Sequence, residues 1–285
     1  MSKAVPDYVC VGNFCLDEAP GGFTLGGTVS YGGRAAIELG ATVGILTSGN
    51  PEDRERVEAS LPGAQLCWVD SPKSMVFRNV YSTDGRRTQH LLSEASPLSI
   101  EHLPDGWESA PIVHLGPLAG EVSVDFVEAI GAQSLVGVTP QGWLRRRRAD
   151  GLVESRAWED YSEVLDRADA LVFSEDDVPS EREASRYVSS ARLAVVTRAA
   201  KGADVITDGR VARVPAFPAH AVDPTGAGDV FAAAFFLELR RSESPLEAAR
   251  FAAAAAAFLI EKPGVDGLAS EAEVRKRMSG DTGAG

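Results

Sequence analysis

Two glycines and an aspartate stand directly before a long apolar run in the last quarter of the chain. Segment 223–229 reads Asp-Pro-Thr-Gly-Ala-Gly-Asp, and the apolar residues 230–237 that follow fit a helix. At a helix start, the backbone N–H groups of Gly226, Ala227 and Gly228 converge with little side chain in the way, and the helix dipole adds partial positive charge. This pattern predicts an anion-binding site.

Asp229 is the unexpected member of this segment, because a carboxylate in the first turn of such a helix repels an anion. Its presence makes sense if it takes a proton from a hydroxyl group that attacks a bound phosphate. The alternative is an ordinary helix start, where an acidic residue is favoured anyway. Neither common phosphate-binding motif is present, since Phe231 occupies the third position of a Gly-x-Gly-x-x-Gly pattern and Lys73-Ser74 follows a proline.

Short apolar segments that alternate with helical segments must position this site. We expect buried strands at 8–12, 42–47, 112–115, 135–138, 170–173 and 193–197, and helices at 28–39, 125–130 and 245–261. This alternation predicts an α/β fold with a parallel sheet covered on both faces. Segments 77–81 and 87–91 flank Asp84-Gly85 and predict a hairpin, with 23–25 as a strand beside it. We therefore expect one domain, 1–285, whose small β lid is formed by about 18–27 and 74–92.

Charge and composition exclude several classes of protein. The chain has 28 Lys and Arg against 41 Asp and Glu, a net charge of −13, which disfavours nucleic acid and anionic membranes as partners. Its three cysteines form no Cys-x-x-Cys pair, so we expect reduced thiols in a cytoplasmic protein. One phosphate ligand remains compatible with this charge, because its attraction to a helix N-terminus is local.

The C-terminal segment resembles a family signature. Asp-x-x-Gly-Ala-Gly-Asp at the start of an apolar helix is similar to the signature of the ribokinase-like (PfkB) carbohydrate kinases. Gly26-Gly27, segment 12–17 and the turn 197–202 resemble further family motifs, so the resemblance covers nearly the whole chain. It implies a Rossmann-like three-layer α/β domain with a mostly parallel central sheet and a small β lid. It also implies ATP-dependent phosphorylation of a small hydroxylated molecule.

The resemblance also implies a role for each matching residue. Asp229 would be the general base, and the N–H groups of Gly226, Ala227 and Gly228 would stabilise charge on the moving phosphoryl group. The substrate would be bound by Asn13, Asp17, Gly26, Gly27, Tyr31, Arg78, Gln141 and Arg145. The ATP site would include Thr197, Gly202, Thr225, Gly226 and Gly228. Glu175 and Asp177 are candidates to hold Mg²⁺, directly or through water. The alternative, given equal weight, is that this acidic segment is a solvated loop. K⁺ activation is left open.

The segment Gln141-Gly-x-x-Arg145 resembles the branch of the family that includes the myo-inositol kinases. Four positions depart from the family pattern: Ser174 replaces Asn and Asp177 replaces Glu in one motif, Ala199 replaces a glycine of the turn 197–202, and Tyr31 replaces the Asn of ribokinase itself, which argues against ribose. We read Arg146–Arg148 as a solvated loop and His114 as a core residue.

Three functions fit these observations. The first is a sugar or cyclitol kinase. The second is a nucleoside kinase, in which Tyr31, Phe23 and Phe77 would form the floor under the base. The third, from a different class, is a retired kinase that only binds its ligand; Asp229 argues against it. For each, a monomer or a homodimer through the lid is possible. The sequence does not name the acceptor.

Overall fold

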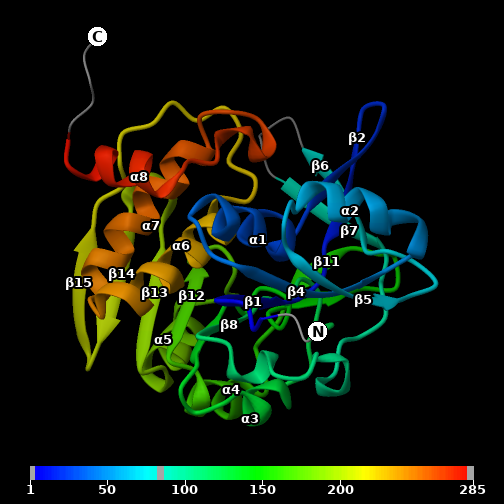
Figure 1. Ribbon diagram of the computed structural model, residues 1–285, viewed down its shortest axis with the longest axis horizontal. Coiled ribbons are helices and arrows are strands. Elements are labelled where there is room, and N and C mark those ends of the chain that lie inside the picture. Colours follow the sequence, from blue (N-terminus) through cyan, green and yellow to red (C-terminus); the bar gives the residue numbers. More distant parts are fainter. Residues whose placement is uncertain (1–3, 82–86, 281–285) are drawn as a thin grey trace.

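The computed structural model describes residues 4–81 and 87–280, and its centre is a nine-stranded sheet (Figure 1). The strands follow the order β15-β14-β13-β12-β9-β8-β1-β4-β5. Their bounds are β1 Tyr8–Val11, β4 Val43–Gly49, β5 Gln65–Asp70, β8 Ile112–Leu115, β9 Leu135–Val138, β12 Ala170–Ser174, β13 Leu193–Thr197, β14 Ala203–Thr207 and β15 Arg210–Val214. All neighbours pair in parallel except β14, which is antiparallel to both β13 and β15.

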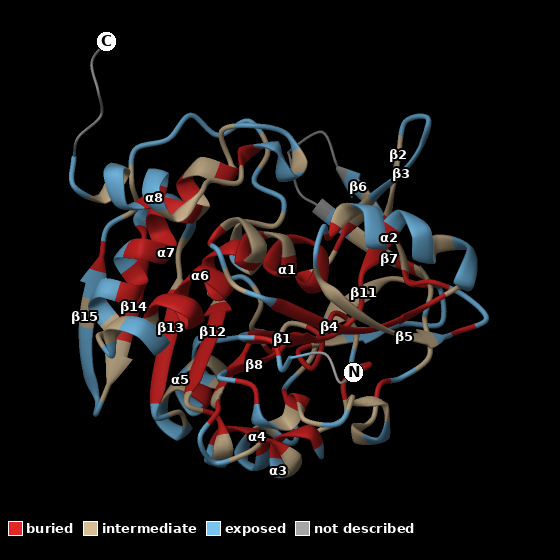
Figure 2. Cartoon of the chain, viewed as in Figure 1, coloured by how far each residue is buried: buried red, intermediate tan, exposed pale blue. Residues whose placement is uncertain are grey.

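Both faces of this sheet are covered by helices, as its apolar strands require. Helices α1 Thr28–Glu38, α2 Arg54–Ser60, α6 Ala227–Ser242, α7 Pro245–Leu259 and α8 Glu271–Met278 lie on one side. Helices α3 Phe126–Ala129, α4 Tyr161–Arg167 and α5 Glu181–Ser190 lie on the other. Successive residues of β1 alternate between the two cores: Tyr8 and Cys10 pack in one, Val9 and Val11 in the other. Figure 2 shows the buried residues concentrated in the sheet and in α6 and α7.

A separate four-stranded sheet forms the lid, with strand order β3-β2-β6-β7. Its strands are β2 Cys15–Ala19, β3 Gly22–Gly26, β6 Val76–Tyr81 and β7 Arg87–Ser93. The expected Asp84-Gly85 turn lies outside the described residues. Met75, Phe77 and Leu91 form a small apolar core with Cys15 and Leu118, so the lid packs against the loop that follows β8.

The fold class predicted from the sequence is confirmed, and all six expected strands are present. The solvated loop expected at Arg146–Arg148 is wrong in part, because Arg145–Arg147 form strand β10, paired with β11 Val153–Ser155. The edge strands β5 and β15, and β14 beside β15, were not predicted. Among the described residues, no helix is both long enough and apolar enough to cross a membrane.

Candidate active site

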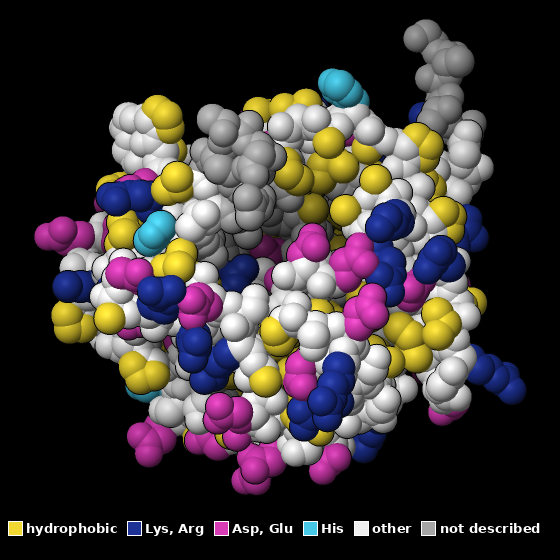
Figure 3. Space-filling view, turned by 180° about the vertical axis from the view of Figure 1, so that it is seen from behind, with side chains coloured by type: hydrophobic (Ala, Val, Ile, Leu, Met, Phe, Trp, Pro, Cys, Tyr) yellow, Lys and Arg dark blue, Asp and Glu magenta, His cyan; other side chains and the backbone are white. Residues whose placement is uncertain are grey.

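A cavity of about 330 Å³ lies between the lid and the carboxyl ends of the central strands. The loops that follow β8, β9 and β12 reach it, as do strand β2 and the N-terminus of α6. Ligands of open α/β sheets bind at this edge, where loops from neighbouring strands meet. The face shown in Figure 3 is hollowed, and acidic and basic side chains lie beside the hollow.

The first turn of α6 supplies the anion-binding end of the cavity. Gly226 precedes the helix with φ of +78°, a left-handed conformation that glycine adopts without strain. The N–H of Ala227 donates to the carbonyl of Pro224 at 3.2 Å and closes the turn. In the described chain, the N–H groups of Gly226 and Gly228 donate to no backbone carbonyl. Two of the three donors expected from the sequence therefore remain for a ligand.

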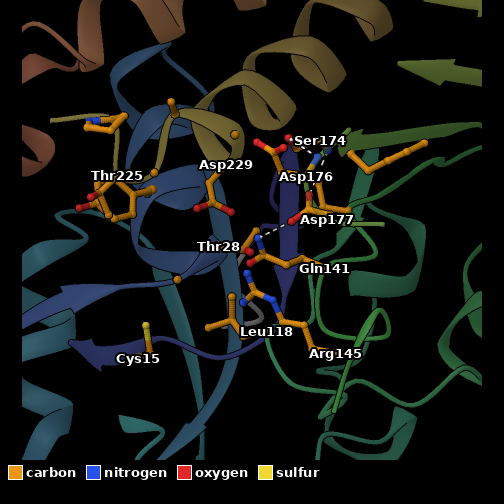
Figure 4. Close-up of a pocket in the computed structure, with 18 of the residues that line it drawn as sticks. Cys15, Thr28, Leu118, Gln141, Arg145, Ser174, Asp176, Asp177, Thr225 and Asp229 are labelled. Carbon is orange, nitrogen blue, oxygen red and sulfur yellow. Dashed lines mark hydrogen bonds between the residues drawn. The ribbon is translucent and has the colours of Figure 1, made fainter. Parts of the chain in front are cut away.

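Asp229 lies in the first turn of α6, and its carboxylate points into the cavity beside Thr28 (Figure 4). Burial raises the pKa of Asp229 to about 6, and the nearby charge of Asp177 adds to the rise, while a hydrogen bond from Thr28 and the charge of Arg145 oppose it. The residue keeps some exposed surface through the cavity, although protein atoms surround the carboxylate. A carboxylate with this pKa is ionised at neutral pH and remains basic enough to accept a proton.

Polar residues from the loops after β9 and β12 face Asp229 across the cavity. Gln141 Nε2 donates to Asp177 Oδ1 at 3.0 Å, and Asp177 Oδ2 accepts the N–H of Ser174 at 3.0 Å. The Arg145 guanidinium extends from the start of β10 toward the same space (Figure 4). Arg145 is therefore placed to attract the negative charge of a phosphoryl group.

The lid contributes a row of polar side chains. Asn79 Nδ2 donates to Asp17 Oδ1 at 3.2 Å, and Gln89 Nε2 donates to Asn79 Oδ1 at 3.1 Å. All three residues line the cavity. Asp17 Oδ2 occupies the position where a Cβ on Gly26 would lie, which explains the glycine there. Carboxylate and amide groups in such a row suit a ligand with several hydroxyl groups.

The structure brings most of the residues predicted from the sequence to one cavity. Those that line it are Asp17, Gly27, Tyr31, Gln141, Arg145, Asp177, Thr197 and 225–229. Asn13, Gly26, Arg78, Glu175 and Gly202 are not among the lining residues. Asn13 is fully buried, and its Oδ1 accepts the N–H of Ser48 at 2.8 Å, so it fixes the loop after β1. Arg78 is exposed and forms an ion pair with Glu18 on the outer side of the lid.

The acidic segment after β12 is divided between two environments. Glu175 forms an ion pair with Arg198, which also bonds to Asp204 at 2.8 Å. Asp176 and Asp177 line the cavity instead. Within 4–81 and 87–280, no group of three or more His, Cys, Asp or Glu side chains is arranged to hold a metal. These carboxylates fit Mg²⁺ only if water and phosphate oxygens complete its shell, which is how proteins usually bind Mg²⁺.

Several cavity residues were not predicted. Thr28, Asn79, Gln89, Thr139 and Asp176 all line it. Thr28 had a signal in the sequence, because it is the first helical residue after Gly27, beside the lid. Ala199, where the family pattern has glycine, adopts φ of +46°, so the turn keeps the left-handed backbone without the glycine.

Comparisons with known proteins bear on the family and the fold. The pfkB family carbohydrate kinase profile matches residues 144–272. A cytidine kinase from Thermococcus kodakarensis is 26% identical over 265 residues, which span 85% of this chain and 91% of the relative. A pyrophosphate-dependent myo-inositol-1 kinase superposes with a TM-score of 0.79 at 21% identity, covering 96% of this chain and 99% of the other. Ribokinase from Arabidopsis thaliana, solved with ribose and ATP, gives 0.73 at 18% identity, with 96% and 99% covered.

The sequence matches indicate the kind of enzyme, and the structural matches show the fold. The profile covers the arginine of the loop after β9, the acidic segment and the whole first turn of α6. The structural matches extend to the lid and the N-terminal half. Residues 144–272 match the pfkB family carbohydrate kinase profile, the chain has the ribokinase fold, and the protein is a phosphotransferase whose acceptor is a hydroxyl group of a sugar or a nucleoside.

Proposed function

We propose that this protein transfers the γ-phosphoryl group of ATP to a hydroxyl of a small sugar or cyclitol that resembles myo-inositol. The observation that carries the proposal is the position of Asp229. Its carboxylate, with a pKa raised to about 6 by burial, stands at the anion-binding start of α6 and shares one cavity with the polar row Asp17, Asn79 and Gln89. A base between a phosphate site and a hydroxyl-binding site is what the reaction needs.

The proposed reaction uses each side of the cavity. Asp229 accepts the proton of the attacking hydroxyl as that oxygen bonds to the γ-phosphorus and the bond to the donor breaks. The N–H groups of Gly226 and Gly228 and the guanidinium of Arg145 stabilise charge on the moving phosphoryl group. Closure of the lid excludes water, which otherwise competes as acceptor. Mg²⁺, held near Asp176 and Asp177 through water, would neutralise donor charge.

A cyclitol or sugar suits the acceptor side because Asp17, Asn79 and Gln89 offer both donors and acceptors. The second candidate is a nucleoside, because Tyr31 and Phe77 line the cavity and a relative of similar length is named cytidine kinase. Phe23, the third aromatic residue considered from the sequence, is 43% exposed and is not among the lining residues.

The test of the proposed function is an ATP-consumption assay of the protein with myo-inositol, common hexoses, cytidine and adenosine as acceptors. We expect turnover with a cyclitol or a sugar. Faster turnover with a nucleoside would reverse the order of the two candidates. Absence of turnover with every acceptor and donor would favour the ligand-binding alternative.

The donor is tested in the same assay, because the myo-inositol-1 kinase above is described as pyrophosphate-dependent and the ribokinase was solved with ATP. In this chain Thr197 lines the cavity and the turn that follows it keeps its left-handed residue, which supports a nucleotide. We expect ATP to be used at least tenfold faster than pyrophosphate. Equal or faster use of pyrophosphate would contradict the ATP assignment.

Asn79→Leu tests the lid row. We expect the KM for the acceptor to rise about tenfold, because a lost hydrogen bond to a bound hydroxyl weakens ground state and transition state alike, while kcat stays within about threefold. Arg78→Leu is the matched control, since the preceding residue of β6 points to the outside of the lid and its loss should leave KM unchanged. A rise in KM of the same size in both variants would show that the lid was disturbed as a whole.

A further inference from the structure

A buried chain of three side chains leads from the core to the cavity wall. Tyr8 Oη lies 2.6 Å from His114 Nδ1, and His114 Nε2 lies 2.8 Å from Thr139 Oγ1. Tyr8 and His114 are fully buried, on the adjacent strands β1 and β8. Thr139 follows the last residue of β9 and lines the cavity. The mechanism described above uses none of these three residues.

The imidazole of His114 is neutral in this position, because burial lowers its pKa to about 3. A neutral imidazole has one nitrogen that donates and one that accepts. One of its two neighbours must therefore donate a hydrogen bond to the ring, and the other must accept one from it. The direction of the three-residue hydrogen-bond chain thus depends on which ring nitrogen carries the proton. Phe236 packs edge-on against the ring, with centroids 4.9 Å apart, and holds the plane of the imidazole.

The hydroxyl of Tyr8 sets the direction of this hydrogen-bond chain. It is fully buried, and the imidazole nitrogen at 2.6 Å is its strongest available acceptor, since the thiol of Cys10 is a weak one and the charge of Asp229 acts on Tyr8 without a hydrogen bond. A buried O–H without an acceptor is costly, so Tyr8 donates to His114 Nδ1. Nε2 must then carry the proton and donate to Thr139 Oγ1. The histidine N–H then occupies one of the two lone pairs of Thr139 Oγ1, and the O–H of Thr139 remains available to donate elsewhere.

Thr139 lies near Thr28, the residue that donates a hydrogen bond to Asp229. A Cβ placed on Gly116 would meet Thr28 Cγ2 at 2.5 Å and Thr139 Oγ1 at 3.2 Å, so the two threonines flank the same glycine. Thr28 forms the hydrogen bond to Asp229. The hydroxyl of Thr139 therefore lies next to the place where the acceptor hydroxyl and the phosphoryl group meet.

We propose that Thr139 donates a hydrogen bond to an oxygen of the transferring phosphoryl group, and that Tyr8 and His114 are positioning residues that keep its hydroxyl in the donor role. The inference rests on the proposed function for the identity of the ligand. A phosphoryl oxygen can only accept, so a hydroxyl fixed as a donor matches it. A hydroxyl group that was free to rotate would spend part of its time pointing its lone pairs at the phosphate.

The direction of the chain is tested without any substrate. Side-chain ¹⁵N NMR of the protein labelled at histidine reports which ring nitrogen carries the proton, and the His114 signals are assigned by their loss in His114→Gln. We expect protonated Nε2 and unprotonated Nδ1 in the parent protein. In Tyr8→Phe we expect a mixture of the two tautomers. A parent protein with the proton on Nδ1 would overturn the proposal.

The contact is tested with a matched pair of variants. Thr139→Val removes the hydroxyl and keeps the shape, and we expect kcat to fall about 10²-fold with the KM for the acceptor within threefold. Thr139→Ser keeps the hydroxyl, and its kcat should stay within about threefold of the parent value. Tyr8→Phe should lower kcat three- to tenfold at unchanged KM.

Two kinetic outcomes would overturn the proposal: an equal loss of kcat in the Val and Ser variants, or a rise in KM for the acceptor at unchanged kcat. A parent protein without turnover would refute the proposed function, and binding of inorganic phosphate measured by calorimetry then decides this inference alone. We expect phosphate to bind Thr139→Val at least fivefold more weakly than Thr139→Ser. Equal affinities would show that Thr139 does not contact the phosphate.

Discussion

Asp229→Asn should lower kcat by about 10³-fold and leave the KM for the acceptor within about threefold. Loss of a general base costs 10²- to 10⁴-fold, and here the burial that raises the pKa of Asp229 to about 6 makes the carboxylate a better base than an exposed one. The asparagine keeps the size of the side chain and can still accept the hydrogen bond from Thr28. Steady-state kinetics with the preferred acceptor measure the effect, and undiminished turnover in the variant would refute Asp229 as the base.

The pH dependence of the parent protein gives a second measurement on the same group. Because only the ionised carboxylate accepts a proton, kcat/KM should fall about tenfold per pH unit below about pH 6 and level off above it. The small residual activity of Asp229→Asn should lack this acid limb. An unchanged limb in the variant would assign it to another group.

Stability should change in the opposite sense from activity. The pKa of Asp229 is higher in the folded protein than its usual value of 3.8, so the folded state binds the extra proton between about pH 4 and pH 6. Stability therefore falls as pH rises through this range, and the cost of the buried charge is fully present above it. At pH 8 the melting temperature of Asp229→Asn should exceed that of the parent, and at pH 4 the two should agree. A variant that melts lower at pH 8 would contradict the pKa assignment.

The sequence was most informative where the chemistry is local. The anion site and its base lie within seven consecutive residues, 223–229, and a helix start needs nothing from the rest of the chain to expose its N–H groups. The buried strands were also predictable, because a strand covered on both faces is apolar throughout. The hairpin of β14 and β15 carried a readable signal that was missed: Asp208 and Gly209 join the strands with φ of +51° and +72°, as a tight Asp-Gly turn requires.

The lid residues show where reading the sequence fails. The sequence predicts Arg78 as a substrate-binding residue, yet Asn79 faces the cavity and Arg78 points to the other side. Neighbouring residues of a strand point to opposite faces, so the choice depends on which face of β6 meets the cavity. That is decided by the parallel pairing of β6 with β2, whose residues are some 60 positions earlier in the chain. The position of Glu175 could not be predicted for a similar reason, because its ion-pair partner Arg198 lies on a different loop.

Gly226→Ala should abolish most of the activity and destabilise the fold, because alanine at this position causes both backbone strain and a steric clash. Its φ of +78° strains any residue with a Cβ, at a cost of about 1–2 kcal/mol. A Cβ there would also meet Tyr31 Cγ at 2.3 Å, and Tyr31 is only 5% exposed, so its ring could yield only into the cavity that it lines. Overpacking of this kind costs about 1–3 kcal/mol more.

In Gly226→Ala, therefore, either the Tyr31 ring moves into the cavity or the start of α6 moves, and with it the N–H groups and the base. We expect kcat/KM to fall about 10³-fold, since misplaced phosphate donors and a misplaced base both contribute. The melting temperature should fall by roughly 5–10 °C. Two controls separate the causes: Gly40→Ala has a φ of +87° but no neighbour within 4 Å, and Gly228→Ala has neither strain nor a clash. The melting temperature of Gly40→Ala should fall by less than that of Gly226→Ala, and its activity should not change. The melting temperature of Gly228→Ala should equal that of the parent protein. If Gly226→Ala were no less stable than Gly40→Ala, the contact between Gly226 and Tyr31 would not be what fixes the anion site.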